Sequence, residues 1–416
     1  MLHFVFTLLA LYALATALTC WYYRISFIVF FLFFFFLVNV FGFFFVDDSI
    51  AFKDDAKLVV MSLLFGLVTV FLYFCLNFLF STSVTRNMMI SPPLRVGAYP
   101  ILFFALATLG FLAFYIKAGV TLDGDYNARI QKNAGNGALV ILMYGYLAAI
   151  ATYLVGGKAD NLRGFLLIST TAIAFGGAYY LLIGGSRNLI AASLFIVLIW
   201  LIATKKIKIP VAAACGLVLF AALLLLEYYR YALSLEGFTF NKGLILFSES
   251  LSPSHAIRNI YSWLSSTSYN LQHLTTFFNE FAIVVPRAMW EDKPINFMNN
   301  GYYYTTQILG LDTNLTISPT LVGSAIIMFG EHAYLFSPIC AVVLYAFDKM
   351  LFSRRVLLKS FALCLLPYVF FMVRDGLEVF LYVGIKFLIV FFLAMMISLS
   401  LKTVKEVSRV SKSELS

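Results

Sequence analysis

The sequence predicts an all-α fold: a polytopic bundle of transmembrane helices forming a single integral membrane domain over residues 1–416. Hydrophobic residues make up 62% of the chain and charged residues only 12%, whereas about a quarter of the residues of soluble domains are charged. The mean hydropathy of +0.93 excludes a soluble fold. Residues 30–36 are all Phe or Leu, so this segment has no polar face and must contact lipid or other helices.

Apolar windows long enough to cross a bilayer divide the chain into eleven predicted spans. A transmembrane helix needs about 17–25 predominantly apolar residues. Such windows lie near residues 2–20, 25–46, 58–80, 97–116, 137–156, 164–183, 189–204, 209–226, 333–352, 356–373 and 379–401. A partial or re-entrant helix at 316–330 raises the count to twelve in an alternative interpretation. Residues 2–20 are interpreted as a retained span, because Arg24 follows them and no Lys or Arg precedes them, the reverse of a signal peptide.

Basic residues in the short connections predict the orientation, because Lys and Arg accumulate on the cytoplasmic side. One side carries sixteen of them against four acidic residues: Arg24, Arg86, Arg95, Lys158, Arg163, Lys205, Lys206, Lys208, Lys349, Arg354, Arg355, Lys359, Lys402, Lys405, Arg409 and Lys412. The other side carries twelve basic and sixteen acidic residues, and Lys386 lies within the last span. We therefore expect a multi-pass protein of the bacterial inner membrane with a periplasmic N-terminus and a cytoplasmic C-terminus.

Composition also limits the ligands. The five cysteines lie in apolar stretches without CxxC spacing, which argues against a disulfide framework or a zinc site. The net charge of +9 is explained by orientation, because no basic cluster lies on a polar domain, so no nucleic-acid partner is expected. Asp47-Asp48 and Asp54-Asp55 match no metal-loop spacing, so we expect a solvated loop of like charges there, with no metal site and no cofactor. No P-loop, GxSxG or HExxH motif is present.

Function is expected on the outer face, where the predicted topology leaves one long periplasmic loop, residues 227–332. This loop is rich in Tyr, Trp, Asn, Ser and Thr, as in residues 299–305. Such residues suit stacking and hydrogen bonding to a polar ligand, although an ordinary aromatic belt has the same composition. We expect amphipathic helices in this loop, lying along the membrane boundary and walling a cavity.

Two arginines in tight outer turns are the sharpest candidates for chemistry. Arg187 follows Gly184-Gly-Ser186, and Arg374 begins Arg374-Asp-Gly-Leu-Glu378. A guanidinium group forms bidentate bonds to phosphate oxygens, so the pair is predicted to converge and clamp a diphosphate. The competing interpretations are a snorkelling Arg187 and an i, i+4 salt bridge between Arg374 and Glu378. Ionisable groups at membrane depth are usually functional, which favours the clamp.

Other charged residues are weaker candidates. Single basic residues such as Arg129, Arg258 and Arg287 are more often solvated charges. Spacing does not identify a proton acceptor among Glu280, Asp292, Glu331, Asp375, Glu378, His255, His273 and His332. His332 is mildly favoured because the long loop re-enters the membrane there.

An ordered set of short blocks resembles the Wzy-type polysaccharide (O-antigen) polymerases, and among them the enterobacterial common antigen polymerases. The blocks are Ile183-Gly-Gly-Ser-Arg-Asn188, Ser252-Pro253, Val284-Val-Pro-Arg-Ala-Met-Trp-Glu-Asp-Lys-Pro294 with Asn299 and Tyr302, Ile317-Ser-Pro-Thr-Leu-Val-Gly-Ser324, and Val373-Arg-Asp-Gly-Leu-Glu378. They cover residues 183 to 378. The resemblance implies a GT-C-like fold, as in O-antigen ligases, and a metal-independent glycosyltransferase.

The implied reaction moves a growing glycan from undecaprenyl diphosphate to the terminal sugar of an incoming undecaprenyl-diphosphate-linked repeat unit, with the chain-length-regulating co-polymerase Wzz as partner. The catalytic candidates are Arg187, Arg374, Glu378, Asp375 and His332. The substrate-binding candidates are Arg129, Arg287, Asn188, Tyr302 and Ser318. The alternative is a flippase or transporter of lipid-linked oligosaccharides. Such a protein is expected to carry mid-span charges and internal repeats, but only Lys386 lies in mid-span and no repeat is visible.

Overall fold

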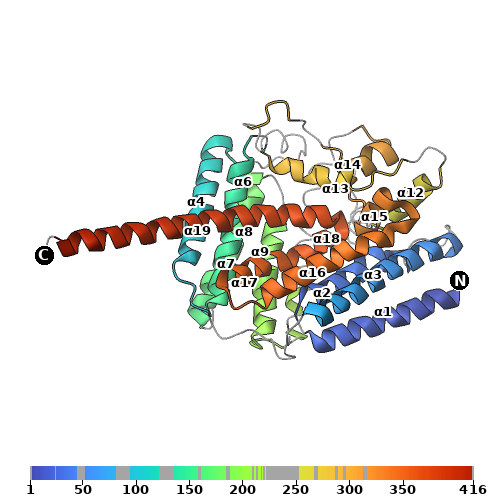
Figure 1. The fold of residues 1–416 in the computed structure, drawn as a ribbon, viewed down its shortest axis with the longest axis horizontal. Helices are drawn as coiled ribbons and strands as arrows, with labels where there is room; N and C mark the ends of the chain where they lie inside the picture. Colours follow the sequence, from blue (N-terminus) through green and yellow to red (C-terminus); the bar gives the residue numbers. More distant parts are fainter. Residues whose placement is uncertain are drawn as a thin grey trace. The chain divides into compact units, whose positions relative to one another are not determined.

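The computed structural model gives the positions of most of the chain (Figure 1). It describes residues 2–23, 25–44, 52–80, 94–120, 133, 135–157, 161–183, 188–208, 210–211, 214–216, 218, 221, 253–266, 270–285, 289–293, 297–312 and 316–414. Within these ranges every regular element is helical and no strand is present. The all-α prediction is therefore confirmed for the described part of the chain.

Eight helical segments of the described residues are long and apolar enough to cross a membrane. They are His3–Tyr22, Asp55–Phe80, Tyr99–Ala118, Gly137–Val155, Arg163–Ile183, Leu321–Leu351, Val356–Asp375 and Leu377–Leu401, with shorter apolar helices at Phe27–Phe43 and Leu189–Ala203. These segments overlap the predicted spans, whereas more than half of the span expected at 209–226 lies outside the described residues. The partial helix expected at 316–330 is α15 (Leu321–Phe329), which leads through η4 into α16.

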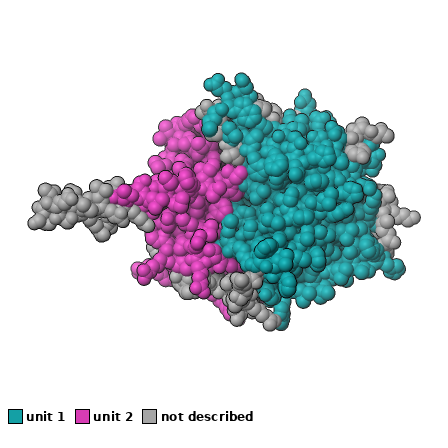
Figure 2. All heavy atoms as spheres, in the orientation of Figure 1, with its two compact units in different colours: residues 1–89, 224–350, 365–383 teal, residues 90–223, 351–364, 384–416 magenta. Residues whose placement is uncertain are grey.

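The chain is divided into two compact units (Figure 2), each assembled from three separate stretches of sequence. Unit 1 comprises residues 1–89, 224–350 and 365–383, and unit 2 comprises residues 90–223, 351–364 and 384–416. The division passes through the last helix, α19 (Leu377–Glu414), which begins in unit 1 and continues in unit 2.

Unit 1 joins the N-terminal helices to the long loop and to the segment around residue 374. Its elements are α1 (Leu2–Tyr22), α2 (Phe27–Asn39), η1 (Phe41–Phe44), α3 (Phe52–Phe80), α12 (Ser254–Leu264), α13 (Thr275–Asn279), η2 (Glu280–Val284), α14 (Asn300–Tyr303), the π-helical turn η3 (Tyr304–Ile308), α15, η4 (Gly330–Phe336), α16 (Ser337–Leu351), η5 (Leu366–Tyr368) and α18 (Val369–Asp375). Phe35 of α2 stacks on Phe65 of α3 with ring centroids 5.8 Å apart. The Tyr12 hydroxyl of α1 donates to the Leu32 carbonyl, so the first three helices form one aromatic core.

Helix α2 begins at Phe27 because its first backbone N–H groups find side-chain acceptors. The Asp348 carboxylate of α16 accepts hydrogen bonds from the N–H groups of Phe27 at 2.7 Å and Ile28 at 3.4 Å. The Ser26 hydroxyl accepts from Val29 N–H at 3.3 Å. The first N–H groups of a helix have no partner within the helix, and a negative charge at this end is also favoured by the helix dipole.

Unit 2 contains α4 (Tyr99–Ala118), α6 (Gly137–Met143), α7 (Gly145–Val155), α8 (Leu162–Ile183), α9 (Asn188–Ala203), α17 (Val356–Leu365) and most of α19. Phe103 of α4 and Phe391 of α19 lie with ring centroids 4.6 Å apart. The Tyr146 hydroxyl of α7 donates to the Leu189 carbonyl of α9 at 2.7 Å. Lys386, a mid-span lysine, has its ammonium 5.3 Å from the centroid of the Tyr144 ring, a cation–π contact that reduces the cost of a charge in an apolar span.

Candidate functional site

The long loop contains a short amphipathic helix, α12, which packs its apolar side into unit 1. Ala256, Ile257, Ile260 and Leu264 are buried, and their spacing of three or four residues places them on one helical face. His255 is exposed on the other side. The expectation of amphipathic helices in residues 227–332 therefore holds for α12, and its position along the membrane boundary stays a prediction.

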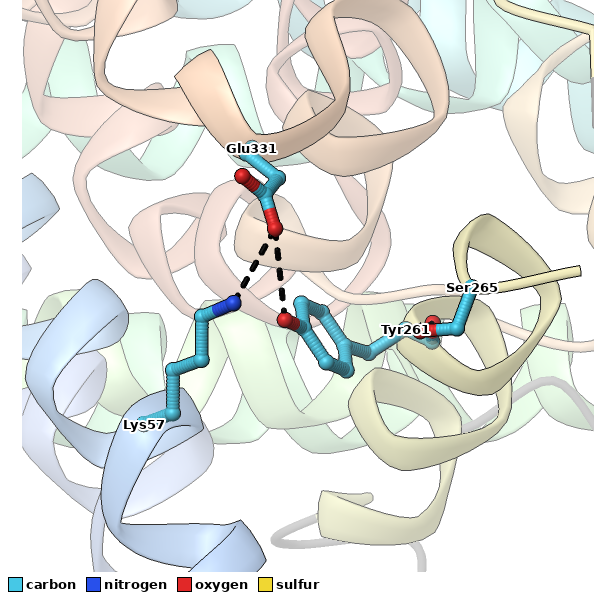
Figure 3. Close-up of polar contacts among 4 residues, drawn as sticks. All are labelled: Lys57, Tyr261, Ser265 and Glu331. Carbon is cyan, nitrogen blue, oxygen red and sulfur yellow. Dashed lines mark hydrogen bonds and ion pairs between the residues drawn. The ribbon is translucent and has the colours of Figure 1, made fainter.

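One exposed ion pair joins α3 to η4 in unit 1, and a tyrosine of α12 contacts both of its members (Figure 3). The ammonium of Lys57 on α3 lies 3.0 Å from Oε1 of Glu331 on η4 and 4.9 Å from the ring centroid of Tyr261 on α12. The Tyr261 hydroxyl approaches the same carboxylate oxygen at 3.4 Å, and the Ser265 hydroxyl donates to the Tyr261 carbonyl. The side chains of Lys57 and Glu331 are 54% and 64% exposed. Solvent screens such a pair, so it contributes at most about 1 kcal/mol.

A second ion pair joins α12 to α3, and its position contradicts two expectations from the sequence. Arg258 of α12 donates through Nε to Oδ1 of Asp55 on α3 at 2.7 Å, and its Nη2 donates to Oδ2. Their side chains are only 11% and 8% exposed, so Arg258 is not a solvated charge. Asp55 does not lie in a solvated loop, because α3 begins at Phe52. The guanidinium also lies 5.4 Å from the centroid of the Phe43 ring. This pairing could not be predicted from sequence spacing, because 203 residues separate Arg258 from Asp55.

The sharpest break in the C-terminal helices occurs at Gly376, between α18 and α19. Its φ of +119° belongs to a region that side-chain-bearing residues rarely adopt. A Cβ at this position would lie 2.6 Å from Oε1 and 2.7 Å from Oε2 of Glu378. Glycine is therefore needed here both for the backbone conformation and for the space that the Glu378 carboxyl group occupies.

Glu378 is buried in a cluster of polar side chains that come from four elements. Asn300 of α14 donates through Nδ2 to Oε1 of Glu378 at 2.7 Å, and its own Oδ1 accepts from the hydroxyl of Thr276 on α13 at 2.6 Å. The Ser324 hydroxyl of α15 approaches the same Oε1 at 3.4 Å. All four residues are buried. The competing interpretation, an i, i+4 salt bridge between Arg374 and Glu378, does not fit the described residues: the helix is interrupted between them, and the Glu378 carboxylate accepts its hydrogen bond from an amide.

A second buried carboxylate borders this cluster. Glu280 accepts a hydrogen bond of 2.5 Å from the amide of Asn299, whose Oδ1 in turn accepts from the backbone N–H of Tyr302 and begins α14. Tyr302 therefore lies in the turn that carries Asn300. Next to it, burial raises the pKa of Tyr303 above its ordinary value, so this phenol remains a neutral hydrogen-bonding group.

Arg374 lies at the end of α18 with its charge partly open to solvent. Its Nη1 lies 2.9 Å from Oδ1 of Asp375, and the two side chains are 28% and 19% exposed. The Ser318 hydroxyl, from the segment before α15, donates to the Arg374 carbonyl. Four predicted site residues (Arg374, Asp375, Glu378 and Ser318) thus gather at the α18–α19 break.

The remaining predicted residues lie elsewhere or are not described. His332 is exposed in η4, where its Nδ1 lies 3.2 Å from the Tyr334 hydroxyl, and it takes no part in the cluster around Glu378. Asn188 is the first residue of α9 in unit 2. Arg129, Arg187 and Arg287 lie outside the described residues. In the part of the chain that is described, no group of three or more His, Cys, Asp or Glu residues is arranged to hold a metal ion.

Sequence reasoning did not single out Asn300, Thr276 or Ser324 as site residues. Asn300 and Ser324 do lie within or beside the matching blocks, at Asn299–Tyr302 and at the end of Ile317–Ser324. Thr276 had no such signal. Buried uncharged polar residues in a long loop become recognisable only when their partners are known.

A family model described as WzyE protein, O-antigen assembly polymerase, matches residues 1–413. The chain belongs to this family. The resemblance seen in the short blocks is thereby confirmed, and the WzyE assignment makes the chain a membrane-embedded polymerase of polysaccharide biosynthesis, a glycosyltransferase-type enzyme that acts on lipid-linked glycan units. No solved structure matches the chain.

Proposed function

We propose that this WzyE-family protein transfers a growing glycan from its undecaprenyl diphosphate carrier to the terminal sugar of an undecaprenyl-diphosphate-linked repeat unit at the periplasmic face. The glycan is enterobacterial common antigen or a related O-antigen-like polymer. The family match over residues 1–413 supports the polymerase activity. The cofactor-free, metal-independent chemistry and the co-polymerase Wzz remain expectations from the resemblance.

The proposed mechanism rests on the partly exposed Arg374–Asp375 pair at the α18–α19 break. A departing diphosphate develops negative charge, which a fixed cation stabilises in the transition state. Asp375 holds the guanidinium at this break by a hydrogen bond of 2.9 Å, and a guanidinium carries five N–H donors in a planar arrangement that suits phosphate oxygens. A charge-assisted hydrogen bond of this kind contributes about 1.5–3 kcal/mol, which corresponds to roughly one to two orders of magnitude in rate.

The test is the glycan ladder of a deletion strain complemented with variants. We expect Arg374→Ala to abolish long polymer at normal protein level, and Arg374→Lys to restore it only partly, because an ammonium lacks the bidentate geometry. Asp375→Asn should give shorter or fewer chains through a less well oriented arginine. Arg355→Ala, which removes an exposed arginine between α16 and α17, serves as the control and should give a normal ladder. A normal ladder with Arg374→Ala would refute the assignment.

Arg187 remains a proposed second phosphate ligand on sequence grounds. We expect Arg187→Ala to abolish long polymer without loss of membrane insertion, and Arg187→Lys to restore it incompletely. The ladder and the protein level in isolated membranes are the two measurements. Normal polymer from Arg187→Ala would leave Arg374 as the sole arginine of the proposal. The alternative of a transporter for lipid-linked oligosaccharides finds no support in the family assignment.

A further inference from the structure

The two oxygens of the Glu378 carboxyl group have opposite surroundings. Oε1 lies within hydrogen-bonding reach of Asn300 and Ser324. Oε2 is buried and has no hydrogen-bond partner among the described residues. A buried carboxylate oxygen without a donor is unfavourable and rare in native structures, so its retention calls for a functional reason.

The hydrogen bonds also fix the direction in which Asn300 is oriented. The Thr276 hydroxyl has its acceptor in Oδ1 of Asn300, and Oε1 of Glu378 requires a donor, so the amide must point its NH₂ group at the carboxylate. Rotation of the amide by 180° would face two acceptors toward each other. Thr276 therefore sets the orientation of Asn300, and Asn300 sets the orientation of Glu378.

Other charged and titratable groups surround this carboxylate. Glu280 of η2 lies near enough to repel the Glu378 carboxylate. The Cys340 thiol of α16 is also close enough to interact electrostatically with that carboxylate. Arg374 and Asp375 lie just before the break, on the preceding helix α18. The carboxyl group itself lies against the backbone of Gly376. Glu378 thus follows Arg374, the cation proposed to bind the leaving diphosphate, by four residues in the sequence.

We infer that Glu378 is the proton acceptor of the transfer reaction, with Oε2 as the accepting atom, and that Asn300 and Thr276 are its positioning residues. This inference rests on the proposed polymerase reaction. The acceptor sugar's hydroxyl oxygen forms a bond to the donor's anomeric carbon while the bond from that carbon to the diphosphate oxygen breaks. The hydroxyl proton moves to Oε2, which gives a neutral carboxyl group, and the diphosphate leaves with the electron pair. Solvent then removes the proton.

Burial of Oε2 has a consequence for this step. A substrate hydroxyl reaches the atom only when the surrounding loop segments move aside. The bond from Asn300 keeps the carboxyl group in its accepting orientation, because an amide donor on Oε1 both fixes the torsion of the side chain and favours its charged form. Asn300 therefore acts through Glu378 and does not itself contact the reacting atoms.

The test uses full-length protein in lipid nanodiscs, with lipid-linked repeat units extracted from a polymerase-deletion strain, and follows chain elongation over time. We expect Glu378→Gln to slow elongation by about 10²–10⁴-fold, the usual contribution of a general base. Asn300→Ala should lower kcat by about tenfold with little change in KM. It should also move the acid limb of the pH–rate profile to higher pH, because the carboxylate loses a donor that favours its charged form. Thr276→Val should act in the same direction, and Thr276→Ser, which keeps the donor, should restore the normal profile.

A matched control separates positioning from mere loss of a buried amide. Asn39 of α2 is also fully buried, and its Nδ2 donates to the Val373 carbonyl of α18 without touching Glu378. Asn39→Ala should leave the pH–rate profile unchanged. An Asn300→Ala profile identical to that of Asn39→Ala would overturn the positioning role, and elongation at the normal rate by folded Glu378→Gln would overturn the proton-acceptor role. Wild-type protein that fails to elongate these lipids would instead overturn the proposed function.

Discussion

The burial of the Asp348 carboxylate cannot be explained by the helix that carries it. Asp348 follows Phe347 at the end of an apolar helix, yet its carboxylate accepts two N–H groups of α2 and the Tyr73 hydroxyl of α3 at 2.8 Å. A buried carboxylate is tolerated when donors replace the lost water. Here the donors come from two helices that lie more than 270 residues earlier in the chain, so one side chain ties α16 to both.

We predict that Asp348→Ala markedly lowers the melting temperature of the detergent-solubilised protein. Each buried donor left without a partner costs about 1–3 kcal/mol. Tyr73→Phe removes only one of the three bonds and should have a smaller effect. Thr171→Ala alters only an exposed hydroxyl bonded within its own helix and is the control. A melting temperature for Asp348→Ala equal to that of Thr171→Ala would show that the carboxylate is not a structural anchor.

Two adjacent glycines of α8 have different surroundings where this helix meets α9. A Cβ on Gly176 would lie 2.8 Å from Cβ and 2.9 Å from Cα of Ile190 on α9, whereas a Cβ on Gly177 would meet nothing within 4 Å. Small residues let helices approach closely within membranes. Only one glycine of the pair serves that contact.

We therefore predict opposite outcomes for two neighbouring substitutions. Gly176→Ala should destabilise the protein by about 1–3 kcal/mol, as overpacking does, because backbone atoms of α9 must move. Gly177→Ala should leave stability unchanged or raise it slightly, since alanine favours a helix. Thermal unfolding of both variants in the same detergent is the measurement. Equal melting temperatures would mean that α8 and α9 are not packed at this glycine.

Hydropathy was sufficient to predict where the long apolar helices of the described residues lie, because a bilayer demands long apolar segments whatever their neighbours are. The charged turns and the matching blocks, which are also visible in the sequence, led to Arg374, Asp375, Glu378 and Ser318. None of these patterns predicted the partners: Glu378 is bonded to Asn300, 78 residues away, and no periodicity links the two. The Arg258–Asp55 pair was missed for the same reason, because burial of a charge depends on a partner distant in sequence.

The orientation of the chain across the membrane can be predicted and tested. The asymmetry of Lys and Arg predicts a cytoplasmic C-terminus and a periplasmic long loop. A reporter fused after Ser416 should therefore be active only in the cytoplasm, and one inserted near Asn270, an exposed residue between α12 and α13, only in the periplasm. A periplasmic C-terminus would contradict the predicted orientation and would remove the proposed site from the periplasmic face, where we propose that the units are joined.

The interleaved make-up of unit 1 has a consequence for how the protein is made. Phe27 and its capping carboxylate on Asp348 are 321 residues apart, and a ribosome adds about 5–20 residues per second. The first helices therefore wait in the membrane for roughly 15–65 s, with the start of α2 lacking its final acceptor. During that time the ribosome completes all of residues 90–223, which belong to the other unit. Unit 1 is thus finished only when nearly the entire chain has been synthesised, and the early helices depend on lipid, water or the insertion machinery to satisfy their polar groups until then.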